Sequence, residues 1–320
     1  MTETIPAQQN SKGSDVVCAL CHTNQFAKKL YDANVSPDDI NPEIFSARRL
    51  PDRIHETIYR CEQCGLVYPE HLIDPALLSK LYEQSVYTYD SEETHITRTY
   101  ARYVRKAFAR LKNQTHPLAY MDIGCGNGFM LTAAKEIGFE EVWGLEPSEH
   151  AIEKADPSIR GNIVKGMFSA EMFGDRKFDL ITVFQTLDHI PDPVAFITDI
   201  YKILKPGGLV MCINHNIASL TARILGERCP MIDIEHTFLH TPHTMRLMFD
   251  RAGYTDIDVF SVRNDYPVYV WLRLLPFPKG FKVGMITFLR KIFIGNIIIP
   301  VYPGNLGLIG RKPDSTSSHE

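Results

Sequence analysis

The sequence lacks most features of secreted, membrane-spanning and nucleic-acid-binding chains. Its first fifteen residues contain no apolar core, so we expect no secretory signal. A late apolar segment is short and is interrupted by Arg290 and Lys291, which argues against a transmembrane helix. Lys and Arg number 34 against 38 Asp and Glu, and this balance argues against a general nucleic-acid binder. We therefore expect a cytoplasmic chain, whose 320 residues suit one large domain and one small domain.

Cysteine is also scarce, and the seven present are not spaced like a disulfide framework. Four form two Cys-x-x-Cys pairs, Cys18 with Cys21 and Cys61 with Cys64. Two such turns supply the four soft ligands that tetrahedral zinc requires, and Gly65 suits a left-handed knuckle turn. A redox pair and unpaired thiols are the alternatives, but no thioredoxin-like strand and helix surround either pair. We predict a structural zinc site.

The rest of the chain alternates apolar runs with amphipathic stretches, a pattern that predicts a parallel sheet covered by helices on both faces. The runs are 119–123, 142–145, 180–184 and 209–213. Before them, apolar side chains recur every three or four positions over residues 75–112, which predicts helices. The expected domains are a disordered tail (1–14), a zinc ribbon (15–72), a helical linker or cofactor lid (73–117), an α/β domain (118–312) with an insertion (263–304), and a disordered tail (313–320).

A glycine-rich segment joins the first apolar run to a predicted helix. Three glycines at alternate positions, from Gly124 to Gly128, let the backbone turn sharply and approach a ligand, and the helix start offers unpaired N–H groups. Glu146 ends the next run, 22 positions after Gly124, where a carboxylate accepts both hydroxyls of a ribose. The dinucleotide fingerprint is Gly-x-Gly-x-x-Gly, which differs from the spacing here. A glycine-rich turn of another α/β protein is the alternative.

Read with Asp122, this segment resembles motif I of class I S-adenosylmethionine-dependent methyltransferases, Asp-x-Gly-x-Gly-x-Gly. The resemblance covers residues 119–262 and is closest to small-molecule methyltransferases of the ubiquinone-biosynthesis type. It implies a Rossmann-like seven-stranded sheet with strand six at 256–262 and strand seven at 306–310. Segments similar to the family's fourth strand, the run after it, the turn before strand five and the segment before strand six are 178–184, 187–193, 204–208 and 236–254.

The resemblance also implies S-adenosylmethionine as cofactor, with residues expected around each of its parts. For the methionine part they are Asp122, Gly124, Cys125, Gly126, Gly128 and Gln185; for the ribose they are Glu146, Pro147 and Ser148; for the adenine they are Met167 and Phe168.

Methyl transfer is an in-line displacement in which the protein positions the nucleophile and removes its proton. Candidates for this work at the tips of strands four and five are Asp188, His189 and His215, and His236 and His240 are expected at the pocket entrance. Each histidine also fits a hydrogen-bonded structural role. In ubiquinone-type relatives, carboxylates and the histidine near strand four bind a divalent cation, but Gln185 replaces one carboxylate here.

The insertion between the last two expected strands is apolar and basic. Residues 263–312 contain eight Lys or Arg and one acidic residue, Asp265. One interpretation is a lid that covers the acceptor together with Tyr87 or Tyr89. The other is a surface that sits on a membrane or takes a lipid-linked substrate.

We predict methyl transfer to a small-molecule, sugar or lipid-linked acceptor, at oxygen by family frequency. A ribosomal-RNA methyltransferase is one alternative, since some of those begin with a zinc ribbon. Residues 1–72, however, carry seven basic against ten acidic side chains, and the Asn/Asp-Pro-Pro-Tyr/Phe motif of base methylation is missing. A non-enzymatic cofactor-binding protein is the other alternative, against which the complete set of motifs argues. The oligomeric state stays open.

Overall fold

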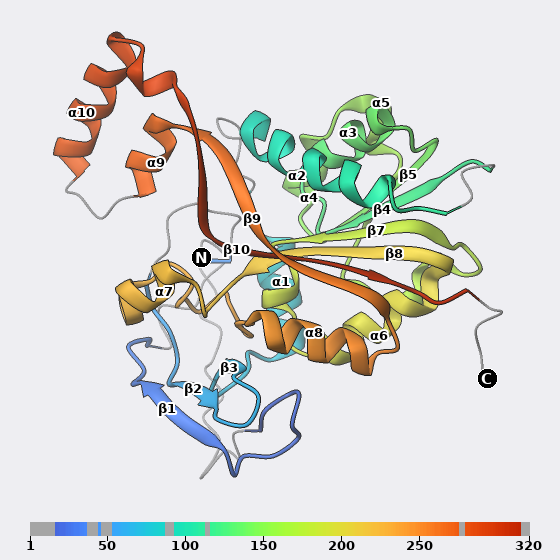
Figure 1. The fold of residues 1–320 in the computed structure, drawn as a ribbon, viewed down its shortest axis with the longest axis horizontal. Helices are drawn as coiled ribbons and strands as arrows, with labels where there is room; N and C mark the ends of the chain where they lie inside the picture. The colour runs from blue at the N-terminus through green and yellow to red at the C-terminus, as the bar shows by residue number, and fades with distance from the viewer. Residues whose placement is uncertain are drawn as a thin grey trace, which may run out of the picture.

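Seven strands form the central sheet of the computed structural model, in the order β6-β5-β4-β7-β8-β10-β9 (Figure 1). Neighbours from β6 to β8 run parallel, whereas β10 lies antiparallel between β8 and β9. This arrangement confirms the predicted seven-stranded Rossmann-like sheet. The strands are β4 (Ala119–Ile123), β5 (Glu141–Glu146), β6 (Ile163–Lys165), β7 (Phe178–Phe184), β8 (Leu204–His215), β9 (Thr255–Pro267) and β10 (Ile298–Arg311).

The structure describes residues 17–36, 44–45, 53–86, 93–112, 116–274 and 279–314. The expectations for residues 1–14, for 315–320 and for Tyr87 and Tyr89 concern parts of the chain outside these ranges. Within them, no helix combines the length and the apolar character needed to cross a membrane.

Helices cover both faces of the sheet, as the sequence pattern predicts (Figure 1). Alternate residues of a strand point to opposite faces, so Tyr120 packs with α2 and α3 whereas Met121 packs with α6 and α8. The helices are α1 (Pro75–Glu83), α2 (Glu93–Phe108), α3 (Phe129–Ile137), α4 (Glu149–Glu153), α5 (Pro157–Arg160), α6 (Pro193–Ile203), α7 (Leu220–Leu225), α8 (Pro242–Arg251), α9 (Val268–Leu274) and α10 (Lys279–Lys291), with 3-10 turns η2 (Ala170–Phe173), η3 (Leu187–His189), η4 (Gly226–Arg228) and η5 (Ile294–Asn296).

Three strand boundaries differ from the prediction. β8 begins at Leu204, which pairs with Phe178, so the expected turn at 204–208 belongs to the strand. An irregularity in the pairing and the positive φ of Gly207 (76°) let the strand pass through this segment. β9 and β10 also run past their expected ends at residues 262 and 306, because 264–267 pair with 298–301. The insertion is therefore the tip of a long hairpin, which carries α9 and α10 away from the sheet (Figure 1).

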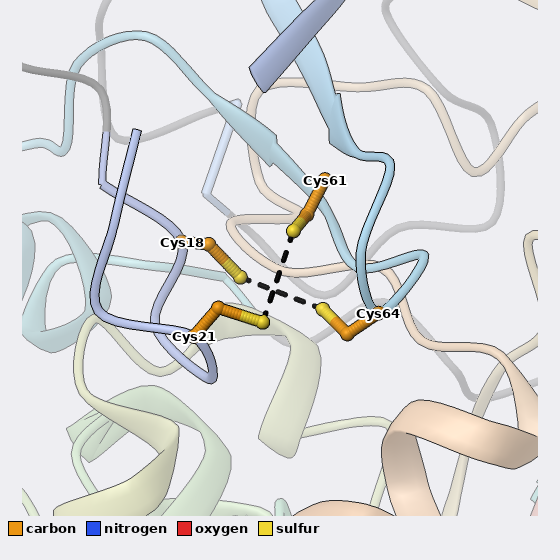
Figure 2. A group of neighbouring side chains, drawn as sticks. All are labelled: Cys18, Cys21, Cys61 and Cys64. Carbon is orange, nitrogen blue, oxygen red and sulfur yellow. Dashed lines mark hydrogen bonds between the residues drawn. The ribbon is translucent and has the colours of Figure 1, made fainter. Parts of the chain in front are cut away.

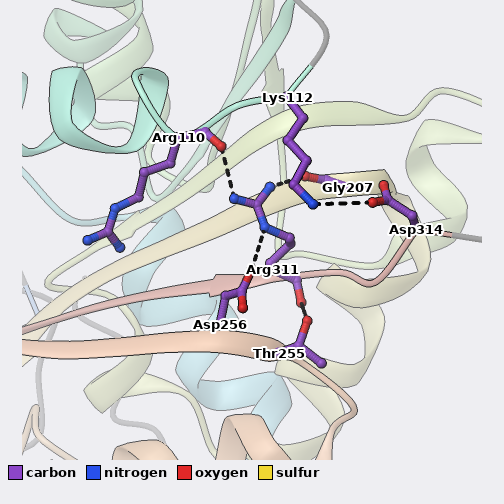
Figure 3. Close-up of polar contacts among 7 residues, drawn as sticks. All are labelled: Arg110, Lys112, Gly207, Thr255, Asp256, Arg311 and Asp314. Atoms are coloured by element: carbon purple, nitrogen blue, oxygen red, sulfur yellow. Dashed lines mark hydrogen bonds and ion pairs between the residues drawn. The ribbon is translucent and has the colours of Figure 1, made fainter. Parts of the chain in front are cut away.

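Arg311 fixes the opposite end of this hairpin (Figure 3). Its guanidinium donates to the Asp256 carboxylate at 3.0 Å and to the carbonyls of Gly207 at 2.8 Å and Arg110 at 2.9 Å. The Arg311 side chain is largely buried, and these three bonds tie β10 to β8, β9 and the chain after α2. Only the far end of the hairpin projects.

The N-terminal ribbon is a three-stranded antiparallel sheet of β1 (Ala27–Tyr31), β2 (Ile58–Cys61) and β3 (Val67–Pro69). Its apolar face does not form a separate core: Leu20, Leu66 and Tyr68 share one buried cluster with α8 and the underside of the sheet. Val67 and Leu239 exchange two backbone hydrogen bonds of 3.2 and 2.9 Å. The ribbon therefore supports the segment that leads from α7 to α8.

Candidate active site and metal centre

A cavity of about 740 Å³ opens beyond the carboxyl ends of β4, β5, β7 and β8. Ligands of open parallel sheets bind at this edge, and the volume falls in the range of small-molecule sites, about 300–1,000 Å³. Of the residues predicted from the sequence, the cavity is lined by Asp122, Gly124, Gly126, Glu146, Pro147, Ser148, Met167, Phe168, Gln185, His189 and His215.

The glycine loop after β4 adopts backbone conformations that other residues rarely reach. Gly124, Gly126 and Gly128 have φ of 76°, 56° and 75°. The amide of Gly124 donates to the carbonyl of Leu145 at 2.8 Å, which holds the loop against the end of β5. A Cβ on Gly124 would lie 2.4 Å from the Oγ1 of Thr186. The loop conformation therefore requires glycine for both torsional and steric reasons.

Two predicted cofactor residues, Cys125 and Gly128, do not line the cavity. The Cys125 side chain is buried under the loop, where its sulfur packs against Gly144. Gly128 packs against Ile159 and Ile163. Both residues therefore support the conformation of the loop and do not face the cavity.

We expect Gly124→Ala to lower the free energy of unfolding by about 2–4 kcal/mol, from left-handed strain and collision with Thr186. Thermal unfolding of the purified variant measures this change. Gly161→Ala is the matched control, because a Cβ there meets nothing within 4 Å. Adding Thr186→Ala to Gly124→Ala should restore the part of the unfolding free energy that is lost through the collision. Equal stability of Gly124→Ala and the control would contradict the assignment.

Two carboxylates lie beside the loop. Glu146 accepts from the amides of Gly126 and Ser148, one on each oxygen and both at 2.9 Å. Each oxygen keeps an acceptor site, since an ionised carboxylate has about four. Burial raises the pKa of Glu146, against the two N–H bonds, which lower it. Burial likewise raises the pKa of Asp122 to about 7, although the Thr182 hydroxyl donates to it at 2.7 Å.

Gln185 follows β7 with a positive φ of 51°, and its backbone N–H donates to the carbonyl of Ile213 at 2.7 Å. Its side-chain Oε1 is buried and has no hydrogen-bond partner among the described residues. A buried acceptor in a cavity wall is normally satisfied, so this atom fits a donor group on a bound ligand.

At the opposite end of the cavity, Asp188 on η3 anchors a group of histidines, although this predicted site residue does not itself line the cavity. Its carboxylate accepts from the Nδ1 of His215 at 2.6 Å and from the side-chain amide of Asn214 at 3.1 Å. Burial alone raises the pKa of Asp188, but the charge and hydrogen bond of His215 hold it well below its usual range. In the neutral form of His215, an Nδ1–H donated to Asp188 leaves the free lone pair of the ring on Nε2. The Asp188–His215 pair is therefore suited to removing a proton from a bound acceptor.

Two more histidines surround this pair. The His189 Nδ1 is bonded to the hydroxyl of Tyr82 on α1 at 2.9 Å. The ring of His236 lies 4.5 Å from His215 and 5.0 Å from His189, and burial lowers its pKa well below the usual value. Asp188, His215 and His236 place ligand atoms within 4.8 Å of one another, so among the residues that the structure describes this group beside the cavity could hold a divalent cation.

His236 lines the cavity as expected, but His240 does not. It is fully buried beside Thr244, and burial lowers its pKa to about 4, so it is a neutral core residue.

The four ribbon cysteines converge on one point (Figure 2). The sulfurs of Cys18 and Cys64 are 3.5 Å apart, those of Cys21 and Cys61 are 3.8 Å apart, and all four lie within 4.8 Å. A tetrahedral zinc ion with bonds of about 2.3 Å separates its sulfurs by about 3.8 Å, so the residues fit this metal. The residue after each pair has positive φ, 53° at His22 and the predicted left-handed turn, 88°, at Gly65.

Comparison with known proteins finds similarity to methyltransferases. Residues 93–259 match the methyltransferase domain family. The chain is 33% identical over 155 residues to a ubiquinone biosynthesis O-methyltransferase of a Shewanella species, covering 44% of this chain and 65% of that protein. It is 30% identical over 112 residues to an uncharacterised methyltransferase of Schizosaccharomyces pombe, covering 31% of this chain and 40% of that protein. The chain thus spans less than two thirds of the length of either relative.

Among solved structures, an S-adenosylmethionine-dependent methyltransferase from Archaeoglobus fulgidus aligns with a TM-score of 0.46 and 19% identity. The alignment covers 70% of this chain and 99% of that one.

Proposed function

Because this chain belongs to the methyltransferase domain family, we propose that it transfers the methyl group of S-adenosylmethionine to a hydroxyl oxygen of an acceptor held near Asp188 and His215. The observation that carries the proposal is one cavity with two chemically different ends. A glycine loop and the Glu146 carboxylate lie at one end, and the Asp188–His215 pair lies at the other.

The chain's residues fit the cofactor part by part. Glu146 would accept the ribose hydroxyls, and Met167 and Phe168 would flank the adenine. Asp122, Gly124 and the unpaired Oε1 of Gln185 would meet the methionine part. When bound, S-adenosylmethionine supplies an activated methyl group on a sulfonium.

His215 is the proposed general base. Its Nε2 would take the hydroxyl proton of the acceptor, and Asp188 would hold the ring in the required tautomer and stabilise the resulting imidazolium. His189, fixed by Tyr82, and His236 would confine the acceptor between β7 and β8. We place small-molecule, sugar and lipid-linked alcohols in the acceptor class.

Incubation of the protein with isotopically labelled S-adenosylmethionine and cell extract tests this proposal. Mass spectrometry should find a labelled methyl group on an oxygen of an acceptor. Labelled RNA or protein, or binding of the cofactor without any labelled product, would contradict it. The zinc-ribbon cysteines lie apart from the cavity, and we propose a structural role for that metal.

We expect Glu146→Ala to weaken S-adenosylmethionine binding by about 1–3 kcal/mol, or about 5–150-fold in Kd, because ribose donors and two backbone amides lose their acceptor. Isothermal calorimetry measures the affinity. Glu149→Ala is the control, since Glu149 is exposed and pairs with Lys165 outside the cavity. Unchanged affinity in Glu146→Ala, or an equal loss in the control, would remove Glu146 from the ribose site.

A further inference from the structure

The projecting tip of the β9–β10 hairpin exposes an unusual number of large apolar side chains. Phe293 is 78% exposed and Phe288 61% exposed, in or directly after α10. We call this surface, together with exposed residues of α7, the apolar rim. Its members are Leu220, Ile224, Phe281, Val283, Phe288, Ile292, Phe293, Ile294, Ile297, Ile298, Ile299 and Tyr302.

The same segment carries charge of one sign only. Residues 266–303 contain five Lys or Arg and no Asp or Glu, in a chain whose net charge is −4. Arg290 and Lys291 end α10 beside the exposed rings of Phe288 and Phe293. Basic and apolar side chains thus alternate on one projecting element, as they do in helices that lie in the membrane interface.

The apolar rim borders the mouth of the cavity. Trp271 of α9, Val301 and Pro303 of β10, and Thr221 and Leu225 of α7 all line the cavity. Leu220 and Ile224 of the same α7 helix are each 72% exposed. The loop before α7 contacts β10, since the amide of Asn216 donates to the carbonyl of Gly304 at 2.8 Å. In Figure 1, α7 and the hairpin tip lie on the same side of the molecule.

We propose that the apolar rim docks the protein on an anionic lipid bilayer and that the acceptor enters the cavity from that bilayer as a lipid. This inference rests on the proposed function, which it deepens by naming the acceptor class. The exposed Phe and Ile side chains would insert among acyl chains while the Lys and Arg side chains meet lipid phosphates. An acceptor could then pass between α7 and the hairpin without crossing water.

Other occupants fit this surface less well. Two copies of the chain would oppose basic surfaces that contain no acidic partner, which is unfavourable. RNA would satisfy the positive charges and stack on the exposed Phe rings, but it would leave the five exposed isoleucines between Ile292 and Ile299 without an apolar partner. A bilayer is the partner that uses both properties.

Sedimentation with lipid vesicles tests the proposal on the full-length protein. We expect binding to vesicles of phosphatidylcholine mixed with phosphatidylglycerol, little binding to phosphatidylcholine alone, and loss of binding as NaCl is raised. No binding to the mixed vesicles, or equal binding to both kinds, would overturn it.

Variants with matched controls locate the surface. Phe288→Ser/Phe293→Ser should lower the vesicle partition coefficient about tenfold or more, whereas Phe26→Ser/Leu72→Ser, on exposed apolar residues of the N-terminal region, should not. Lys291→Glu should lower it about fivefold or more, and the exposed Lys177→Glu should not. Equal losses in the controls would overturn the assignment to the rim.

Two further measurements separate this inference from the proposed function. Calorimetry with S-adenosylmethionine should give wild-type affinity for every rim variant. Intact cofactor binding without vesicle binding would overturn the docking alone. Vesicle binding without cofactor binding would overturn the proposed function, and with it the lipid acceptor, but not the docking. A dimer dissolved by Phe288→Ser/Phe293→Ser, or an RNA complex lost in Lys291→Glu, would replace the bilayer with that partner.

Discussion

Replacing Asp188 with asparagine is expected to slow methyl transfer by about 10²–10⁴-fold while cofactor binding persists. Asparagine keeps the shape of the side chain but removes the charge that fixes the tautomer of His215 and stabilises its protonated form. Asp188 acts through His215, which lines the acceptor end of the cavity, whereas Gly126 and Glu146 line the other end. The loss should therefore fall on the rate and not on the affinity for S-adenosylmethionine.

Single-turnover transfer from labelled cofactor, measured across pH, tests this expectation. Asp192→Asn is the matched control, because Asp192 is an exposed carboxylate that caps α6 four residues away. A purely structural role would lower the melting temperature and the cofactor affinity together, without changing the pH profile. Loss of wild-type activity with a chelator and recovery with a divalent cation would instead assign Asp188, His215 and His236 as metal ligands.

Cys61→Ser is expected to remove zinc from the protein and to unfold the ribbon, because one of four converging thiolates is lost. Structural zinc contributes about 10–16 kcal/mol in small zinc-binding domains, far more than a typical core residue. Unfolding of the ribbon should also destabilise the methyltransferase domain. Leu20, Leu66 and Tyr68 lie in one core with Phe238 and Met245, and β3 holds Leu239, three residues after His236.

Elemental analysis and thermal unfolding measure the outcome. Wild-type protein prepared without chelator should contain one zinc per chain, and Cys61→Ser should contain none and melt at a lower temperature. Cys229→Ser is the control, since Cys229 is buried but lies outside the cluster. Zinc-free wild-type protein, or full zinc content in Cys61→Ser, would overturn the assignment of the metal site.

The sequence predicts best the strands and turns that are determined by neighbouring residues. β4 and β7 lie in the parallel part of the sheet and are buried on both faces, so they appear as mainly apolar runs. β4 has the predicted bounds, and β7 begins two residues before the apolar run at 180–184, where the segment similar to the family's fourth strand begins. Glu146 was found because it ends such a run after a glycine loop. The knuckle turns were equally local, since each is fixed by a few neighbouring residues.

Long-range pairing was beyond the sequence. The extension of β9 and β10 depends on each strand finding the other, and Pro300 and Pro303 argue locally against a strand. His236 was expected at the cavity entrance, but the backbone contact that holds its segment, between Leu239 and β3, joins positions more than 160 residues apart. The core that the ribbon shares with α8 likewise joins residues far apart in the chain, so no local pattern predicts it.

That shared core has a consequence for synthesis on the ribosome. The ribbon is made before α8, and its four cysteines come from one stretch of chain, but its apolar face waits for residues near α8. The carbonyl of Leu20 meets the guanidinium of Arg251, 231 positions later. At about 5–20 residues per second this delay is roughly 10–50 s. During that time Leu66 and Tyr68 stay exposed on the nascent chain, so the ribbon offers a target to chaperones that bind apolar segments until α8 is made.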